Sequence, residues 1–438
     1  MCSSALASPF LGRPAAMQTH DPLTNWAGNV TYSTDHIEEV NSVEEIRSYV
    51  RSVEKVKVLG TRHCFNSIAD SRYNLLWLKN MRGISLDAAA KTVTVEPGVT
   101  YGQLGPYLDQ KGFALQNLAS LPHISVAGAC STATHGSGEK NGNLASAVAG
   151  VELVTAAGDL VKFNHESNAA EFPGAVVSLG ALGAITRVTL KVEPTYQVKQ
   201  YVYQDLPLRQ LQDHFDEIEA SGYSVSFFTD WRAKKVSELW IKTRVGDGRP
   251  FEAPQEFFGA KLAHQNLHPI AGISAENCTE QRGIAGPWYD RLPHFRMGFT
   301  PSAGKELQTE YLLPRKHAVE AIMAIERLQD QVSPHLLISE IRTIASDTLW
   351  MSTCHQQASV AIHFTWKPEW PEVRSVLPSI ERELGPFQAR PHWGKLFTMA
   401  PAELRKRYQE LDAFKELAAK YDPTGKFRND FLNTNLFA

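Results

Sequence analysis

The first 196 residues alternate between short apolar runs and amphipathic segments. Ser42-Val43-Glu44-Glu45 forms a capping box, and the apolar residues after it recur at helical spacing. This pattern predicts a helix that leads into a strand over residues 56–59. A second strand is predicted at 92–96, and a second S/T-x-x-Q start at Thr100 predicts another helix. Further strands are expected at 151–155 and 188–192, so this part reads as α+β or α/β.

Beyond Glu193-Pro194, which should break the last of these strands, the alternating runs become longer. They predict a second α+β unit built on an antiparallel sheet. Its strands are expected at 224–228, 238–243 and 306–312, and its helices near 315–331 and 371–384. The Gly- and Pro-rich span 245–305 is a long excursion of the kind that often covers a site. The tail at 401–420 has the pattern of one amphipathic helix.

Composition narrows the class of protein. The chain has 438 residues, 43% of them hydrophobic and 21% charged, with a formal net charge of −3 and no basic run. We therefore expect a globular protein whose partners include neither nucleic acid nor a membrane. The five cysteines are odd in number and scattered, which argues against a disulfide framework and a zinc site and favours a reducing, cytoplasmic location. Residues 1–20 lack the features of a signal peptide and are predicted to be a disordered leader.

Two stretches in the first half have the composition of an anion-binding loop. In residues 56–67 an apolar run ends at Gly60, and the following turn presents Thr61, Arg62 and His63 at one point. Residues 120–138 are mostly small or hydroxyl-bearing, which lets a long ligand lie against the backbone. The turn alone favours a simpler interpretation, in which His63 caps the following segment. Cys64 and Cys130 are most simply buried small residues, and His123 and His135 lack the partners of a metal site.

Two strands of the second unit carry polar residues in apolar surroundings. The period of two places Glu340 and Arg342 side by side on one face, and His363 and Thr365 on one face of another strand. Each pair alone is consistent with a structural salt bridge or a buried core histidine. Their joint presence, with Lys395 soon after, favours a site that grips several hydroxyl groups. The sheet is accordingly expected to have one apolar and one polar face.

Several motifs together resemble those of the alditol oxidases, also called xylitol oxidases, in the vanillyl-alcohol-oxidase and sugar-1,4-lactone-oxidase group. The resemblance extends from about Thr24 to Phe431. The motifs, in order, are Asn25-Trp26-Ala27-Gly28-Asn29, the loop around His63, residues 120–138, Glu340-Ile341-Arg342, His363-Phe364-Thr365-Trp366 and residues 390–395.

The resemblance implies an α+β, two-domain fold of the vanillyl-alcohol-oxidase type. An FAD-binding domain would span residues 21–196, an antiparallel-sheet substrate domain 197–395, and a C-terminal segment 396–438 that returns to the FAD domain. FAD would be attached covalently through His63 alone, since Cys130 lies too far along its loop for a second link. The family's Gly-Ser-Gly-His-Ser loop here reads Gly60-Thr61-Arg62-His63-Cys64, where Arg62 either adds a phosphate contact or alters the turn.

The same resemblance implies the site residues, with no metal among their ligands. Besides His63, the implied FAD contacts are Val58, Leu59, Gly60, Thr61, Arg62, Cys64, Ala119, Ser120, Ser125, Gly128, Thr132, Ala133, Thr134, His135, Ile185 and His392. The implied polyol contacts are Ser120, Glu340, Arg342, Thr365 and Lys395, with His363 close by.

The activity implied is oxidation of the terminal primary alcohol of an alditol, such as xylitol or sorbitol, to the aldose, with O2 reduced to H2O2. Arg342 and Lys395 would hold the substrate oxygen, and His363 or Lys395 would accept its proton. One alternative is an oxidase or dehydrogenase of L-gulono- or D-arabinono-1,4-lactone. A flavin-free binding protein of the same fold is an alternative from another class. We expect a monomer.

Overall fold

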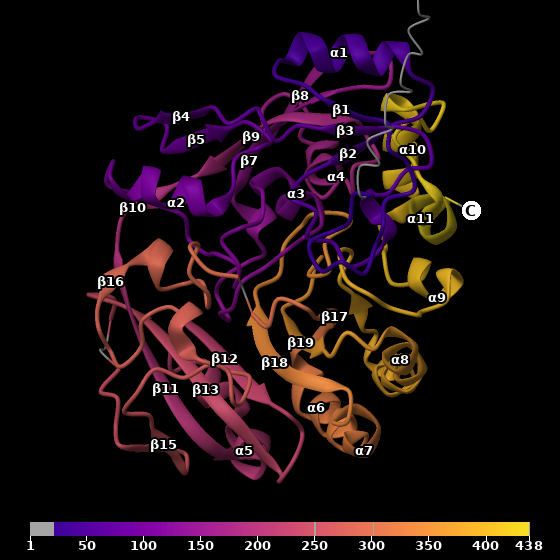
Figure 1. The fold of residues 1–438 in the computed structure, drawn as a ribbon. Helices are drawn as coiled ribbons and strands as arrows, with labels where there is room; N and C mark the ends of the chain where they lie inside the picture. The colour runs from indigo at the N-terminus through magenta and orange to yellow at the C-terminus, as the bar shows by residue number, and fades with distance from the viewer. Residues whose placement is uncertain (1–21, 249–250, 301, 438) are drawn as a thin grey trace, which may run out of the picture.

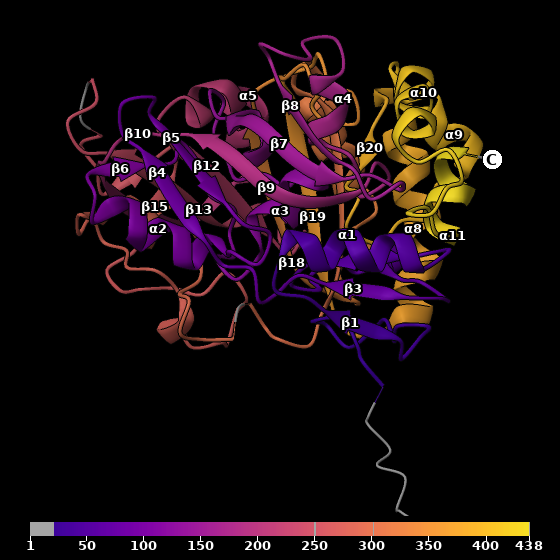
Figure 2. The same cartoon turned by 90° about the horizontal axis from the view of Figure 1, so that it is seen from above.

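The computed structural model describes residues 22–248, 251–300 and 302–437, and the expected leader at 1–20 lies outside these ranges. The described chain forms three sheets and one short strand pair. Figure 1 shows the N-terminal sheets above and the largest sheet below. The C-terminal helices lie beside the N-terminal sheets, as Figure 2 also shows from above.

The N-terminal half contains a parallel and an antiparallel sheet. The parallel sheet has the order β1-β3-β2, with β1 at Ile37–Glu39, β2 at Lys57–Leu59 and β3 at Leu75–Trp77. The antiparallel sheet has the order β4-β5-β9-β7-β8, formed by Ile84–Asp87, Thr92–Val95, Ala184–Lys191, Val148–Val154 and Leu160–Asn164. β6 at Phe113–Ala114 pairs with β10 at Glu193–Pro194.

Two helices of this half begin where the sequence predicts. Ser42 caps α1 (Val43–Ser52) by accepting a hydrogen bond from the Glu45 amide, and Ile46 and Val50 on its inner face are buried. A capping box at Thr100 and Gln103 starts α2 (Tyr101–Asp109). The remaining two helices are α3 at Val126–Ser131 and α4 at Phe172–Val176. The strands predicted at 56–59, 92–96, 151–155 and 188–192 are confirmed as parts of β2, β5, β7 and β9.

The largest sheet is antiparallel and has ten strands, as predicted for the second unit. Its order is β14-β15-β11-β13-β12-β18-β19-β17-β20, with β16 paired to β11. In chain order, β11 to β20 span Gln197–Pro207, Ser224–Thr229, Lys235–Arg244, Glu256–Phe257, Ala260–Leu262, Gly286–Pro287, Leu307–Pro314, Leu336–Ile344, Ser359–Trp366 and Arg390–Pro391. The accompanying helices are α5 at Leu208–Glu219, α6 at Ala318–Glu326, α7 at Gln329–Val332 and α8 at Trp370–Leu384.

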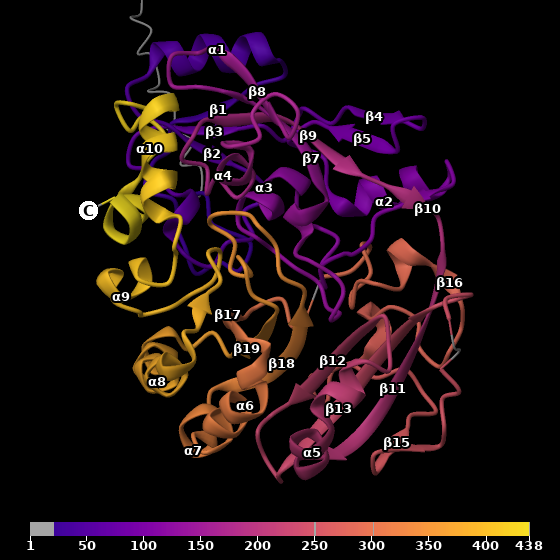
Figure 3. The same cartoon turned by 180° about the vertical axis from the view of Figure 1, so that it is seen from behind.

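The two faces of this sheet differ, as the alternation predicts. On one face Phe227, Ile362 and Phe364 pack in a common core with residues of α5, α6 and α8, which lie on the far side of the sheet from the N-terminal half (Figure 3). The opposite face carries buried charged side chains and is turned toward the N-terminal sheets. Its charged groups are thereby shielded from bulk water.

The C-terminal segment corrects one prediction. The single helix expected over 401–420 is two helices, α9 at Pro401–Arg405 and α10 at Leu411–Tyr421, followed by α11 at Asp430–Leu432. The gap between α9 and α10 includes Arg407, whose carbonyl accepts a hydrogen bond from Arg390 Nε (3.0 Å) instead of one from a continuing helix. Leucines and phenylalanines of α9 to α11 join the N-terminal core. Within the described residues, no helix has both the length and the apolar character needed to cross a membrane.

Candidate active site

One long cavity lies between the N-terminal sheets and the polar face of the largest sheet. It encloses about 1750 Å³, including its open mouth. The lining includes His63 and the predicted FAD contacts Val58, Leu59, Gly60, Thr61, Arg62, Cys64, Ala119, Ser120, Ser125, Gly128, Thr132, Thr134, His135, Ile185 and His392. It also includes Glu340, Arg342, His363, Thr365 and Lys395. Ala133 is the exception, because it is fully buried and does not line the cavity.

The N-terminal wall is formed mainly by backbone and small side chains. The loop after β2 meets the start of α3, where Thr61 Oγ1 accepts a hydrogen bond from the Ser125 amide (3.1 Å). A Cβ atom at Gly60 or Gly128 would lie 2.9 or 2.8 Å from Ser125 Oγ. The absence of side chains at both glycines therefore leaves the Ser125 hydroxyl and nearby backbone open to a ligand.

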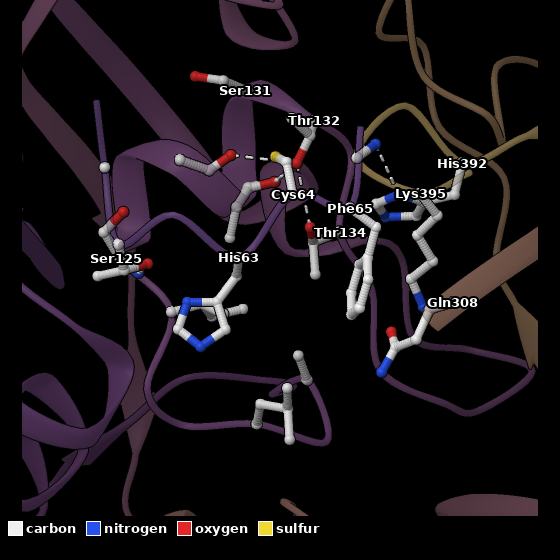
Figure 4. A pocket seen from close by; sticks show the side chains of 18 of the residues that line it. His63, Cys64, Phe65, Ser125, Ser131, Thr132, Thr134, Gln308, His392 and Lys395 are labelled. Carbon is white, nitrogen blue, oxygen red and sulfur yellow. Dashed lines mark hydrogen bonds between the residues drawn. The ribbon is translucent and has the colours of Figure 1, made fainter. Parts of the chain in front are cut away.

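His63 lies on this wall with neither ring nitrogen satisfied. Its ring stacks on Trp26 with centroids 5.5 Å apart, and both nitrogens are buried without a hydrogen-bond partner among the described residues. The interpretation of His63 as a cap is wrong, since Asn66 accepts the Ile68 amide and caps that segment instead. Burial lowers the pKa of His63 to about 4, so its imidazole is neutral at pH 7. Figure 4 shows the ring beside Ser125, with Thr132, Thr134 and Lys395 around the same opening.

Arg62 stands where the family loop has glycine. Its backbone adopts the left-handed region with φ 61°, so the turn that glycine favours is retained with an arginine. Its Nη1 donates to the Thr24 carbonyl (2.6 Å), and the guanidinium lies 5.0 Å from the ring centroid of Trp77. The side chain thus ties the N-terminal segment to the loop, while a phosphate contact stays a prediction.

The sheet-side wall is a row of charged residues brought together by strand register. Glu310 on β17 pairs with His363 on β19, which pairs with Glu340 on β18. Because residues opposite one another in an antiparallel pair point to the same face, these three side chains emerge together. The predicted neighbours Arg342 and Glu340 do lie together, with 3.5 Å between Nε and Oε1.

Glu310 lies at the centre of the ionic contacts in this wall. Its Oε1 lies 2.6 Å from Arg342 Nη2 and 3.3 Å from His135 Nε2, and its Oε2 lies 2.9 Å from Lys395 Nζ. Burial opposes its charge, but Lys395, His135 and Arg342 outweigh burial and hold the pKa of Glu310 well below its usual range. This carboxylate compensates the two cations that face the cavity.

His363 and Lys395 form a hydrogen-bonded pair. Lys395 Nζ lies 2.8 Å from His363 Nδ1, and His363 Nε2 lies 3.0 Å from Thr365 Oγ1. An ammonium group only donates, so Nδ1 accepts and Nε2 carries the hydrogen directed at Thr365. Burial and the charge of Lys395 lower the pKa of His363 to about 4, and burial lowers the pKa of Lys395. At neutral pH His363 is therefore an uncharged base.

Arg342 connects the two walls. Its Nη1 donates to Ser120 Oγ at 3.3 Å, so the predicted polyol contact from the N-terminal half lies against the charged row. Sequence reasoning missed two residues here. Glu310 had a detectable signal, since it alternates with apolar positions in a predicted strand as Arg342 does. His294 lies in the irregular excursion, where no periodicity marks it, yet its Nε2 lies 2.7 Å from Glu340 Oε1.

Comparison with known proteins agrees with the assignment of the two cavity walls to different parts of the chain. A family model described as FAD binding domain matches residues 34–164, and one described as D-arabinono-1,4-lactone oxidase matches residues 301–435. An alditol oxidase of Streptomyces sp. is 46% identical over 414 residues, covering 94% of this chain and 98% of that protein. The chain belongs to the alditol oxidase family.

More distant relatives match this chain over nearly their whole length. An L-gulono-1,4-lactone dehydrogenase of Mycobacterium tuberculosis is 26% identical over 425 residues, covering 93% of this chain and 97% of its own. Cholesterol oxidase from B. sterolicum has a TM-score of 0.77 at 14% identity, covering 98% of this chain and 100% of that structure, a likeness of fold alone. The predicted α+β fold of the vanillyl-alcohol-oxidase type is confirmed.

The residues of the N-terminal wall fit the FAD that the family binds. His63 supplies a buried imidazole with no partner among the described residues, and the glycine-lined loops leave backbone and hydroxyl groups open. An orphaned polar group in such a wall calls for a ligand, because leaving it unsatisfied is costly.

Proposed function

We propose that the protein is an FAD-dependent oxidase that converts the terminal primary alcohol of alditols such as xylitol and sorbitol to the aldose, with H2O2 as second product. The observation that carries the proposal is the row of Glu340, Arg342, His363, Thr365 and Lys395 in the same cavity as the loop of His63. Its dense set of donors and acceptors suits a ligand with several hydroxyl groups. The 46% identity to an alditol oxidase supports the same substrate class.

FAD is proposed to be linked covalently to His63 and held by the loop and α3 residues of the N-terminal wall. When bound, FAD supplies the acceptor for the hydride of the substrate carbon and passes electrons to oxygen. We assign FAD binding to residues 21–196, substrate binding to 197–395, and a supporting role to 396–438. We also propose a monomeric protein in the cytoplasm, in keeping with the four free cysteines of the described residues.

The sheet-side residues orient the alditol and handle its proton. Arg342 and Lys395 are placed to hold the reacting oxygen and stabilise its negative charge as the proton leaves. The substrate proton reaches His363 through Lys395, because His363 Nε2 already carries a hydrogen and Nδ1 is bonded to Lys395 Nζ. The Lys395 ammonium passes one hydrogen to Nδ1 and takes up the proton that leaves the substrate hydroxyl, and His363 is neutral at pH 7 and able to accept it. Glu340, Thr365 and Ser120 would bind the remaining hydroxyl groups, and burial shields Glu340 and Thr365 from bulk water.

The first test is a denaturing gel of the purified protein, viewed under ultraviolet light after acid treatment. Fluorescence on the wild-type band and none on His63→Ala would support covalent attachment, and His123→Ala, a histidine outside the cavity lining, is the matched control. The same preparation is assayed for H2O2 with xylitol and sorbitol. A colourless native protein would instead favour the flavin-free binding protein.

A lactone-oxidising enzyme is the second candidate. The match of residues 301–435 to a D-arabinono-1,4-lactone oxidase model favours it, and the lactone relatives share the full chain length at lower identity. Steady-state rates with xylitol, sorbitol, L-gulono-1,4-lactone and D-arabinono-1,4-lactone separate the two. A higher kcat/KM for either lactone would overturn the alditol assignment, and activity with a dye but not with O2 would indicate a dehydrogenase.

A further inference from the structure

Behind the charged row lies a second group of buried polar residues that the proposed reaction does not use. Lys242 on β13 is 1% exposed, and its Nζ lies 2.5 Å from the Leu292 carbonyl, 3.1 Å from the Pro293 carbonyl and 3.1 Å from His294 Nδ1. An ammonium group has three hydrogens and no acceptor lone pair. Burial lowers the pKa of Lys242 to about 7. In its ammonium form each hydrogen of Lys242 has one acceptor, and all three acceptors lie on the segment that ends at His294.

The tautomer of His294 is fixed by its two neighbours. Burial opposes the charge of Glu340, but Arg342 outweighs burial and holds the pKa of this carboxyl below its usual range, so Glu340 only accepts. The neutral His294 ring therefore carries its hydrogen on Nε2, and its Nδ1 accepts from Lys242. His294 Nε2 lies 2.7 Å from Glu340 Oε1 and can only donate to it. Phe228 and Trp240 pack edge-on against the ring, with centroids 5.5 and 5.1 Å away, so the imidazole is held in this orientation.

The contacts from Lys242 through His294, here called the relay, end at the carboxylate of Glu340, one of the proposed substrate contacts. Glu340 Oε1 is occupied by His294, while Oε2 has no hydrogen-bond partner among the described residues and Glu340 lines the cavity. The His294 and Phe295 amides also donate to the Ser120 carbonyl, at 3.1 and 3.3 Å. The segment clamped by Lys242 thus supports two of the proposed polyol contacts at once.

We propose that Lys242 and His294 are positioning residues of the polyol site: Lys242 locks His294 with its hydrogen on Nε2, and His294 holds Glu340 as an anionic acceptor for a substrate hydroxyl. The inference rests on the proposed function of this cavity. Glu340 accordingly selects for a ligand that offers a free hydroxyl donor at that point. A ligand with an ether or a carbonyl there would leave the carboxylate unpaired, which is costly in a buried site.

The charges around the relay are consistent with a neutral His294. Lys242 is faced by Glu340, Cys278, Arg291 and Arg342, and Glu340 is faced by Arg342, His294 and His363. Burial, followed by the charge of Lys242, lowers the pKa of His294 to about 4. Removing the lysine charge would therefore raise the pKa of His294 toward neutrality.

The tautomer itself is the first test, by NMR of the flavin-loaded protein labelled with 15N-histidine. The resonance absent from His294→Gln belongs to His294, and its shifts should show a neutral ring with hydrogen on Nε2 from pH 5.5 to 8. A ring with hydrogen on Nδ1, or one protonated at pH 6, would overturn the proposal. This measurement decides the tautomer whether or not the protein oxidises alditols.

Kinetics with xylitol form the second test. Glutamine can accept from Lys242 and donate to Glu340, whereas phenylalanine can do neither, so His294→Phe should raise KM about tenfold with kcat changed less than about threefold. His294→Gln should restore KM to within about threefold of wild type. Equal KM values for the two variants would refute the relay.

A third measurement addresses Lys242. Lys242→Met should raise KM and move the tautomer or protonation of His294 at pH 6 in the NMR spectrum. Lys235→Met on the same strand, which removes only an exposed ion pair with Asp205, should change neither. An unchanged His294 resonance in Lys242→Met contradicts the proposal, and flavin absorbance and thermal unfolding identify any variant that fails to fold. No H2O2 from the wild-type protein with any alditol would contradict the proposed function instead.

Discussion

The two walls of the cavity are built on different physical principles. The N-terminal wall offers a ligand mainly backbone and small side chains, together with the His63 imidazole, neither of whose nitrogens has a partner among the described residues. Nearly all of these groups come from residues 58–64 and 119–135. The sheet-side wall consists of buried ionic side chains from four separate segments, β17, β18, β19 and the loop that carries Lys395. The first wall depends on shape, whereas the second depends on a balance of charge.

This difference predicts a difference in sensitivity. A buried charge network responds strongly when one member is removed, because the remaining charges are left unpaired in a medium of low dielectric constant. A backbone cradle spreads its binding over many weak contacts, so that one lost hydroxyl changes little. Three substitutions test the contrast, from the largest expected effect to the smallest.

Removing Arg342 should have the largest effect. Arg342→Ala takes away a preorganised donor to the developing alkoxide and the partner of Glu310, so kcat/KM for xylitol should fall roughly 100- to 1000-fold, about 3 to 4 kcal/mol in the transition state. The control is Arg232→Ala, since among the described residues its guanidinium donates only to the Ser333 carbonyl, away from the cavity. Near-normal turnover of Arg342→Ala would show that this arginine does not stabilise the transition state.

Neutralising Glu310 should have an intermediate, pH-dependent effect. Glu310→Gln keeps the shape but removes the negative charge that raises the pKa of Lys395 against burial. Without it the ammonium form of Lys395 is lost at lower pH, so the alkaline limb of the pH profile of kcat/KM should shift to lower pH. At neutral pH the loss should be about tenfold. A pH profile of kcat/KM that coincides with that of the wild type would show that Glu310 does not control the protonation of Lys395.

Ser125 should show the smallest effect, because it belongs to the backbone wall. Ser125→Ala removes one hydroxyl from the cradle between Gly60 and Gly128 while leaving the amide that binds Thr61. FAD affinity should weaken about two- to tenfold. It is measured by flavin fluorescence titration of the apoprotein in a His63→Ala background, where attachment cannot mask binding. Ser67→Ala, on an exposed residue, is the control. A hundredfold loss would mean that side chains dominate this wall as well.

The wall that is contiguous in sequence was the easier one to predict. Most cradle residues lie within two stretches whose glycines and hydroxyls can be recognised from local composition. The individual FAD contacts were implied by the resemblance to the alditol oxidases, and all of them except Ala133 line the cavity. Ala133 stands between two lining threonines, but its backbone turns left-handed, with φ 54°, and its methyl group is buried in the core, so its contact with FAD stays a prediction.

On the sheet side the sequence identified single strands but not their combination. The period of two correctly placed Glu340 beside Arg342 and His363 beside Thr365. It could not show that the closest carboxylate to Arg342 is Glu310, because that contact follows from the register of three strands that are far apart in the chain. The tail was likewise predicted as one helix because amphipathic spacing continues through Arg407, whereas in the structure the chain leaves the helix there and the Arg407 carbonyl accepts from the distant Arg390.

The sequence by itself determined the elements, the apolar and polar faces of the strands, and the family, since each depends on residues that are near one another or in a fixed order along the chain. The tertiary structure alone decided which charges meet. It left both nitrogens of His63 without a partner among the described residues, and it gathered Glu310, Arg342, His363 and Lys395 into one buried network. The physical reason is that hydrophobic periodicity is a local property, whereas electrostatic pairing depends on distances that exist only after distant strands have come into register.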